Sequence, residues 1–314
     1  MGTAARVLLA LVVVFVAAIW ILGDRDLPAE ELKSRYASAA SQFLELSDGT
    51  VAHVRDQGRH TGPALVLIHG SNASLHTWEP WVAMLRDEFR LISMDLPGHG
   101  LTGRTLRDEY SIAAMNDFID EVTRLQGAGH FHLAGNSMGG RAAWNYALDH
   151  SERVDRLILI DASGFPEPED EEQAIGFLLA SMPVVQNLML FVTPRSVIEE
   201  TLRAAFSNQE LVDDAMVTRY HELLLREGSR EATLARFQLP RNTDRVSELG
   251  RISHPTLILW GDEDRLVPVA DAHRFHAALP NSTLRIYEAV GHLPMEEAPQ
   301  RSAADVRAFL KGEL

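Results

Sequence analysis

Short apolar runs that end at small or polar residues recur along this chain, and they constrain its fold more than any other feature. The runs cover residues 64–68, 91–94, 131–134, 157–160 and 256–260. Helical patterns, such as those over 112–125 and 142–150, alternate with them. Strands that are buried on both faces have this continuous apolar pattern. The chain therefore predicts an α/β fold with a mostly parallel sheet and helices on both faces.

Three more segments complete an expected sheet of eight strands. Residues 43–46 and 51–54 alternate around Asp48-Gly49, which predicts a β-hairpin. Residues 283–287 are expected to form the last strand. Open parallel sheets bind ligands at the carboxyl ends of their strands, so we look for a site at the residues that follow each run.

The alternation stops between residues 164 and 250, where no comparable apolar run occurs. Helical patterns near 175–190 and 212–226 predict a helical lid inserted over the carboxyl edge of the sheet. This lid divides the core into residues 43–163 and 251–314. Apolar residues that would line an acyl pocket beneath it are Phe177, Leu178, Met182, Leu188, Met189 and Phe191.

An uncharged apolar segment covers residues 7–23. As a helix it would be about 25 Å long, close to the hydrocarbon thickness of a bilayer. Bulky residues at its end disfavour cleavage as a signal peptide, which stays an alternative together with a peripheral helix. We therefore expect residues 1–23 to be a single membrane-spanning anchor and residues 24–42 to be a linker. The short N-terminal tail favours a catalytic domain outside the cytoplasm.

The charge and the cysteine count exclude several classes of function. The formal net charge is −15, and no basic stripe is present, which argues against a nucleic-acid partner. The chain has no cysteine, so it can form no disulfide and has no thiolate catalysis. We expect no metal or cofactor, and no pattern indicates the oligomeric state.

The sequence Gly135-Asn136-Ser137-Met138-Gly139 lies between an apolar run and a helical run. A nucleophilic serine at a sharp strand-to-helix turn needs this placement, because flanking glycines allow the backbone to pass closely. The following helix N-terminus favours negative charge. Ser137 is therefore the candidate nucleophile.

A second loop is expected to complete an oxyanion hole beside Ser137. His69-Gly70-Ser71-Asn72 follows the run 64–68. We predict that the backbone N–H groups of Ser71 and Met138 bind the developing negative charge. Possible substrate-pocket residues are Asn72, Asn136 and Leu293.

A general base and its carboxylate partner follow in the chain order that a serine triad requires. His292 comes after the expected last strand, and Asp264 lies in the loop after the run 256–260. Asp262 and Asp161 are alternatives for the acid. Asp264 is preferred because it stands in the loop rather than against the strand.

Together these motifs resemble the α/β-hydrolase family over residues 43–314. The motifs are VLIHGSNAS (66–74), DLPGHG (95–100), LAGNSMGG (133–140), LILWGDEDRLVP (257–268) and VGHLPMEEAP (290–299). The resemblance is to the serine carboxylesterase and lipase-like branch, and it implies hydrolysis of a small-molecule ester or a lipid through an acyl-enzyme. A carbon–carbon bond hydrolase of the ring-cleavage-product type is the alternative, and a non-catalytic binding protein is a third reading. The carbon–carbon hydrolases usually have a glycine-rich stretch at Ser71-Asn72-Ala73 and a tryptophan at Leu293, and this chain departs from both.

Overall fold

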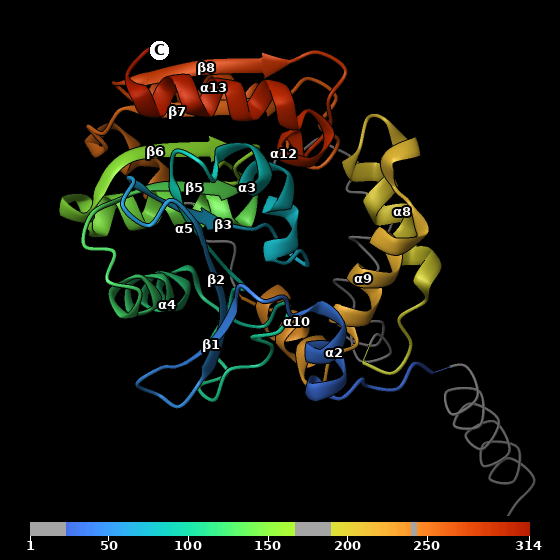
Figure 1. Cartoon of the computed structure of the whole chain (residues 1–314). Coiled ribbons are helices and arrows are strands. Elements are labelled where there is room, and N and C mark those ends of the chain that lie inside the picture. Colours follow the sequence, from blue (N-terminus) through green and yellow to red (C-terminus); the bar gives the residue numbers. More distant parts are fainter. Residues whose placement is uncertain (1–22, 167–189, 240–243) are drawn as a thin grey trace, which may run out of the picture.

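The structure is a computed structural model and describes residues 23–166, 190–239 and 244–314. An eight-stranded sheet forms its centre, with the strand order β1-β2-β4-β3-β5-β6-β7-β8 (Figure 1). The first two strands and β4 pair in an antiparallel way, and all later neighbours are parallel. The predicted eight-stranded, mostly parallel α/β sheet is confirmed.

The strands and helices have the following bounds. The strands are β1 Ser41–Glu45, β2 Val51–Gly58, β3 Ala64–Ile68, β4 Arg90–Met94, β5 Phe131–Asn136, β6 Val154–Ile160, β7 Thr256–Gly261 and β8 Ser282–Tyr287. The α-helices are α2 Ala29–Tyr36, α3 Glu79–Leu85, α4 Ile112–Leu125, α5 Met138–Asp149, α8 Arg195–Ala205, α9 Asp214–Leu224, α10 Ser229–Phe237, α11 Val269–Ala278, α12 Pro294–Glu297 and α13 Pro299–Lys311. Short 3₁₀ turns are η1 Leu75–Trp78, η2 Ser151–Arg153, η3 Gln209–Leu211 and η4 Asp244–Arg251.

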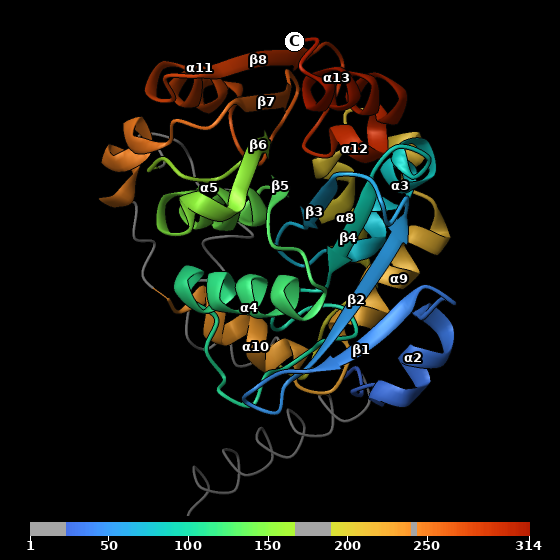
Figure 2. The ribbon, with the colours of Figure 1, turned by 60° about the vertical axis from the view of Figure 1, so that its left-hand side comes forward.

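Alternate residues of each central strand pack on opposite faces of the sheet. In β3, Val66 and Ile68 join the cluster formed with α4, α5 and α11, whereas Leu65 and Leu67 join the cluster formed with α3 and α13. Both faces are covered by helices, as Figure 2 shows for α4 and α5 on one side and for α3 and α13 on the other. Burial on both faces explains why these strands are apolar at every position rather than at every second one.

A helical insertion leaves the sheet after β6 and returns to it at β7. Its described helices are α8, α9 and α10, and they pack against one another beside the carboxyl ends of the strands. The helix predicted near 212–226 corresponds to α9, whereas the pattern near 175–190 lies almost wholly outside the described residues. Of the apolar residues that were expected to line an acyl pocket, only Phe191 is described, and its exposed fraction is 52%. A role of the insertion as a lid stays a prediction.

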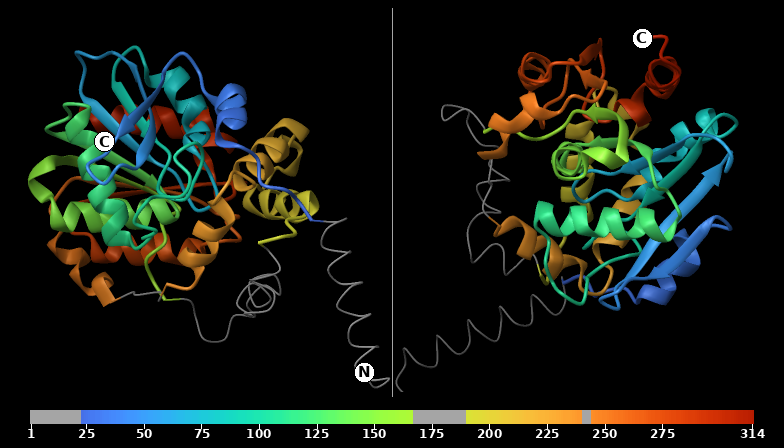
Figure 3. Two further views of the ribbon diagram at one scale, coloured as in Figure 1. Left: turned by 90° about the horizontal axis from the view of Figure 1, so that it is seen from below. Right: turned by 90° about the vertical axis from the view of Figure 1, so that its left-hand side faces the viewer.

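The segment that precedes β1 packs against the helical insertion. Residues 24–42, which were expected to be a linker, contain α2 and the beginning of β1. The backbone of Leu27 pairs with Leu225 and Glu227, which follow the end of α9, at N···O distances of 2.7 and 3.1 Å. Figure 3 shows α2 (blue) next to the gold helices of the insertion.

The predicted localisation at a membrane requires correction. Crossing a bilayer takes about 20 apolar residues in one helix. The longest helix of the described ranges, α4, has 14 residues and contains four charged ones, and none of the helices there is long and apolar enough to cross. The segment predicted as the anchor, residues 1–23, falls almost entirely outside the described residues. The anchored, extracytoplasmic localisation is therefore withdrawn.

Candidate active site

Ser137 occupies the sharp turn between β5 and α5. Its backbone has φ 55° and ψ −119°, a sparsely populated conformation for a non-glycine residue that costs about 1–3 kcal/mol. The neighbouring glycines are required by space: a Cβ at Gly135 would lie 2.2 Å from the carbonyl oxygen of Gly139, and one at Gly139 would lie 2.4 Å from that of His69. The Ser137 N–H donates to the carbonyl of Ile160 at 3.0 Å, which ties the turn to the end of β6.

The loop after β3 passes directly beside Ser137. A Cβ at Gly70 would lie 3.1 Å from the Cβ of Ser137, so Ser71 follows at the edge of the turn. The backbone N–H groups of Ser71 and Met138 have no hydrogen-bond acceptor within the described parts of the chain. Met138 opens α5, whose first amides carry partial positive charge. One donor without an acceptor therefore directly follows Ser137 in the chain, and the other lies in the loop that passes beside it.

His292 and Asp264 are joined by a buried hydrogen bond. The His292 Nδ1 lies 2.7 Å from Asp264 Oδ2, and the exposed fractions of the two side chains are 6% and 0%. The other carboxylate oxygen of Asp264 accepts from the backbone N–H groups of Leu266 and Val267. Because Nδ1–H donates to the carboxylate, Nε2 of the neutral ring is an acceptor, as a general base requires.

Two buried residues, Asn136 and Leu293, lie next to His292. The Asn136 side chain is buried, and its amide nitrogen donates to the carbonyls of Ile160 at 3.2 Å and His292 at 3.1 Å. Leu293 is buried in the apolar cluster next to α12. The insertion adds a contact, because the N–H of His292 donates to the carbonyl of Ala205 at 2.7 Å. Asn136, which directly precedes Ser137, therefore ties the backbone of His292 to the serine turn.

The two alternative acids occupy different surroundings from Asp264. Asp262 is exposed. Asp161 is fully buried at the end of β6, and its Oδ1 accepts from the N–H of Gly261 at 3.0 Å. Burial, and then the negative charge of Asp264, raise the pKa of Asp161 well above its ordinary value. One ligand atom each of Asp161, Asp264 and His292 lies within 4.8 Å of the others, a spacing that would also suit a metal ion. The hydrogen bond between His292 and Asp264 is a sufficient explanation of their closeness.

One further residue at this edge has no signal in the sequence. Arg236, near the end of α10, donates to Ser71 Oγ at 3.2 Å and to Asn72 Oδ1 at 2.7 Å. Asn72 itself adopts a φ of 56°. Arg236 stands 99 residues after Ser137 in a short helix, and only the tertiary fold brings it to the loop.

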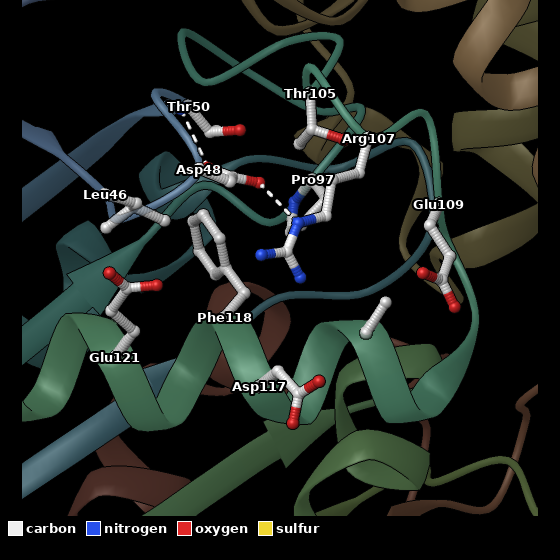
Figure 4. Close-up of a pocket in the computed structure, with 11 residues that line it drawn as sticks. Leu46, Asp48, Thr50, Pro97, Thr105, Arg107, Glu109, Asp117, Phe118 and Glu121 are labelled. Atoms are coloured by element: carbon white, nitrogen blue, oxygen red, sulfur yellow. Dashed lines mark hydrogen bonds and ion pairs between the residues drawn. The ribbon is translucent and has the colours of Figure 1, made fainter.

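A separate pocket lies between the β1–β2 turn and α4 (Figure 4). Arg107 reaches toward Asp48 there, with an N···O distance of 3.4 Å, and Phe118 forms part of the wall. Its lining includes none of the residues at the Ser137 edge. Because this pocket has no nucleophile–base pair, we place the candidate active site at Ser137.

Comparisons with known proteins agree with this architecture. A family profile described as the alpha/beta hydrolase fold matches residues 63–299. An uncharacterised protein of Mycobacterium tuberculosis is 31% identical over 269 residues, which is 80% of this chain and 76% of that protein. The solved structure of a membrane phospholipase A, described as a bacterial virulence factor, is 27% identical with a TM-score of 0.75, over 99% of both chains.

A carbon–carbon hydrolase is also among the structural neighbours. The meta-cleavage product hydrolase from Pseudomonas fluorescens is 24% identical with a TM-score of 0.74, over 87% of this chain and 98% of that one. At this identity the likeness concerns the fold alone. The sheet order, the serine turn and the profile over three quarters of the sequence lead to one conclusion: the chain belongs to the α/β-hydrolase family.

Proposed function

We propose that the protein is a serine hydrolase of carboxylic esters, with Ser137 as the nucleophile. The observation that carries the proposal is the buried hydrogen bond between His292 and Asp264, held beside the strained turn of Ser137. The family assignment supports a hydrolase. The 27% identity to a phospholipase A favours acylglycerol-like esters among the possible substrates.

The proposed reaction has two steps. Ser137 Oγ attacks the ester carbonyl while His292 Nε2 takes its proton, and the alcohol leaves with that proton. Water then attacks the acyl-enzyme with His292 as base, which releases the carboxylic acid and restores the serine. Asp264 holds the ring and stabilises the imidazolium. The amides of Ser71 and Met138 would bind the oxyanion, and each such donor is typically worth a factor of ~10²–10³ in turnover.

The variant Ser137→Ala tests the proposal. It should lower kcat for a panel of p-nitrophenyl and glycerol esters of varied acyl length by several orders of magnitude, and it should abolish labelling by a fluorophosphonate, because the attacking oxygen is lost. Ser163→Ala is the matched control. Ser163 donates only weakly to the Ser137 carbonyl, at 3.3 Å, so this variant should keep labelling and most activity.

Two results would contradict the assignment. Undiminished ester hydrolysis by the Ser137→Ala variant would remove Ser137 from the mechanism. Turnover of a vinylogous diketo acid by the wild type, without any ester hydrolysis, would favour the carbon–carbon hydrolase instead.

A further inference from the structure

A buried guanidinium lies against the loop beside the nucleophile. Arg236 has an exposed fraction of 9%, and its two terminal nitrogens make three hydrogen bonds. One nitrogen donates to Ser71 and Asn72, and the other donates to His99 Nε2 at 2.9 Å. The group therefore joins α10 to the loops that follow β3 and β4.

All three partners of Arg236 are neutral. His99 must be uncharged, because its Nε2 accepts from Arg236 while its Nδ1 donates to the Pro97 carbonyl at 2.9 Å. Burial and the nearby guanidinium push the pKa of His99 well below its ordinary value. Burial also lowers the pKa of Arg236 to about 10, so the guanidinium stays charged at neutral pH.

Arg236 differs in this respect from the other buried arginines of the described ranges. Arg55, Arg153 and Arg230 are buried to a similar degree, and each forms an ion pair with a carboxylate. Arg236 has no such pair with any carboxylate in the ranges that the structure describes. An unpaired charge out of water is costly, so its presence calls for an anion that the folded chain does not itself supply there.

The position of the charge relates it to the substrate. A Cβ at Gly70 would lie 3.1 Å from the Cβ of Ser137, and the next two residues are the partners of Arg236. Ser71 and Asn72 are both exposed, so a molecule bound at Ser137 can reach their side chains. The oxygens of Ser71 and Asn72 accept hydrogen bonds from Arg236 that the oxygens of a bound carboxylate or phosphate could accept instead. A guanidinium is well suited to bind either anion.

We propose that Arg236 is a specificity-determining residue that selects esters with a negatively charged group near the scissile carbonyl. This inference rests on the proposed function. The shared chemistry is an oxyanion with at least two oxygens. It could belong to a carboxylate at the far end of the acyl chain or to the phosphate of a glycerophospholipid.

The test uses two substrate pairs that differ in charge. Monomethyl adipate is compared with methyl hexanoate, and dibutyryl phosphatidic acid with dibutyrylglycerol. The wild type should prefer the charged member of at least one pair, and that pair identifies the source of the anion. Arg236→Gln should lower kcat/KM for that member ~10–100-fold, mainly through KM, since bonds to a charged group are lost. It should leave the neutral member within about two-fold, and Arg236→Lys should recover part of the loss.

Arg230→Gln is the matched control, because Arg230 is a buried arginine of the same helix that pairs with Asp26 at 2.6 Å. It should leave the charge preference intact. If Arg236→Gln does not fold, competitive inhibition of the wild type by butyl phosphate but not by butanol tests the same charge recognition. Equal loss on charged and neutral esters would make Arg236 a positioning residue of the loop and overturn the proposal. So would the absence of both a charge preference and inhibition. If the wild type hydrolyses no ester at all, the proposed function itself fails.

Discussion

Asp161 is a carboxyl group whose pKa the folded protein raises well above its ordinary value. It is fully buried, and its neighbour Asp264 carries the negative charge that His292 uses. Both surroundings raise the pKa of Asp161, burial more than charge. In the unfolded chain the same group loses its proton near pH 4. The folded state therefore keeps this proton to a higher pH than the unfolded state does.

This difference predicts a pH dependence of stability with a definite sign. The free energy of unfolding should fall as pH rises from about 4 toward the folded pKa, because the unfolded state releases a proton that the folded state holds. Asp161→Asn keeps the shape and removes the titration. Its Tm should exceed that of the wild type at pH 7–8 and vary less with pH, as measured by calorimetry from pH 5 to 8. The exposed Asp155→Asn on the same strand is the control. Parallel wild-type and Asp161→Asn profiles would refute the prediction.

The candidate catalytic residues could be proposed from the sequence, because they come soon after the segments that were predicted to be strands. Ser137, Asp264 and His292 each follow a segment that was expected to be a strand, and parallel strands bring such ends together. Arg236 and the bond from Asn136 to the His292 carbonyl could not be foreseen. Both join segments more than 130 residues apart through side chains that have no pattern of their own.

At the scale of elements, the strands were the most predictable part. The expected strand 64–68 coincides with β3, and the expected helix 112–125 coincides with α4. The strand expected at 157–160 begins earlier in the structure, at Val154, because Asp155 and Arg156 interrupt the apolar run while the strand continues through a shift in its register with β5. Charged residues at the beginning of a strand are missed when the strand is predicted from its apolar run alone.

The turn that connects β5 to α5 should tolerate no added side chain. A Cβ at Gly139 would lie 2.4 Å from the backbone oxygens of Ile68 and His69, so Gly139→Ala must displace β3 or α5. Overpacking of this kind costs roughly 1–3 kcal/mol or more. We expect the Tm to fall by roughly 5 °C or more, with loss of esterase activity. Gly129→Ala is the control, since a Cβ there meets no atom within 4 Å, and equal Tm values for the two variants would contradict the argument.

At the scale of the whole molecule, the insertion is held by the N-terminal segment as well as by the sheet. Glu222 of α9 binds Arg35 at 2.6 Å and the Tyr36 hydroxyl at 2.7 Å, and Arg230 of α10 binds Asp26 at 2.6 Å. The position of the insertion between residues 164 and 250 could be predicted from the missing strands. Its partner could not, because these contacts join residues nearly 200 positions apart.

Glu222→Gln should loosen this attachment without affecting the sheet. A neutral amide accepts weaker hydrogen bonds from the Arg35 guanidinium and the Tyr36 hydroxyl than the carboxylate does. We therefore expect amide exchange in α9 to become roughly ten-fold faster while β5 and β6 stay protected. Hydrogen exchange measured by mass spectrometry resolves the two regions. The exposed Glu210→Gln in the same insertion should change neither. Uniform acceleration across the sheet would show that the contact supports the whole fold instead.

The same attachment decides how the molecule would respond to mechanical load. A pull on the chain at residue 23 meets the bonds of Asp26, Leu27 and Arg35 to α9 and α10 before it meets β1. The force therefore reaches the insertion before it reaches the hydrogen-bonded pairing of β2 with β4. Tension on residues 23–36 therefore acts on α9 and α10 before it acts on the sheet.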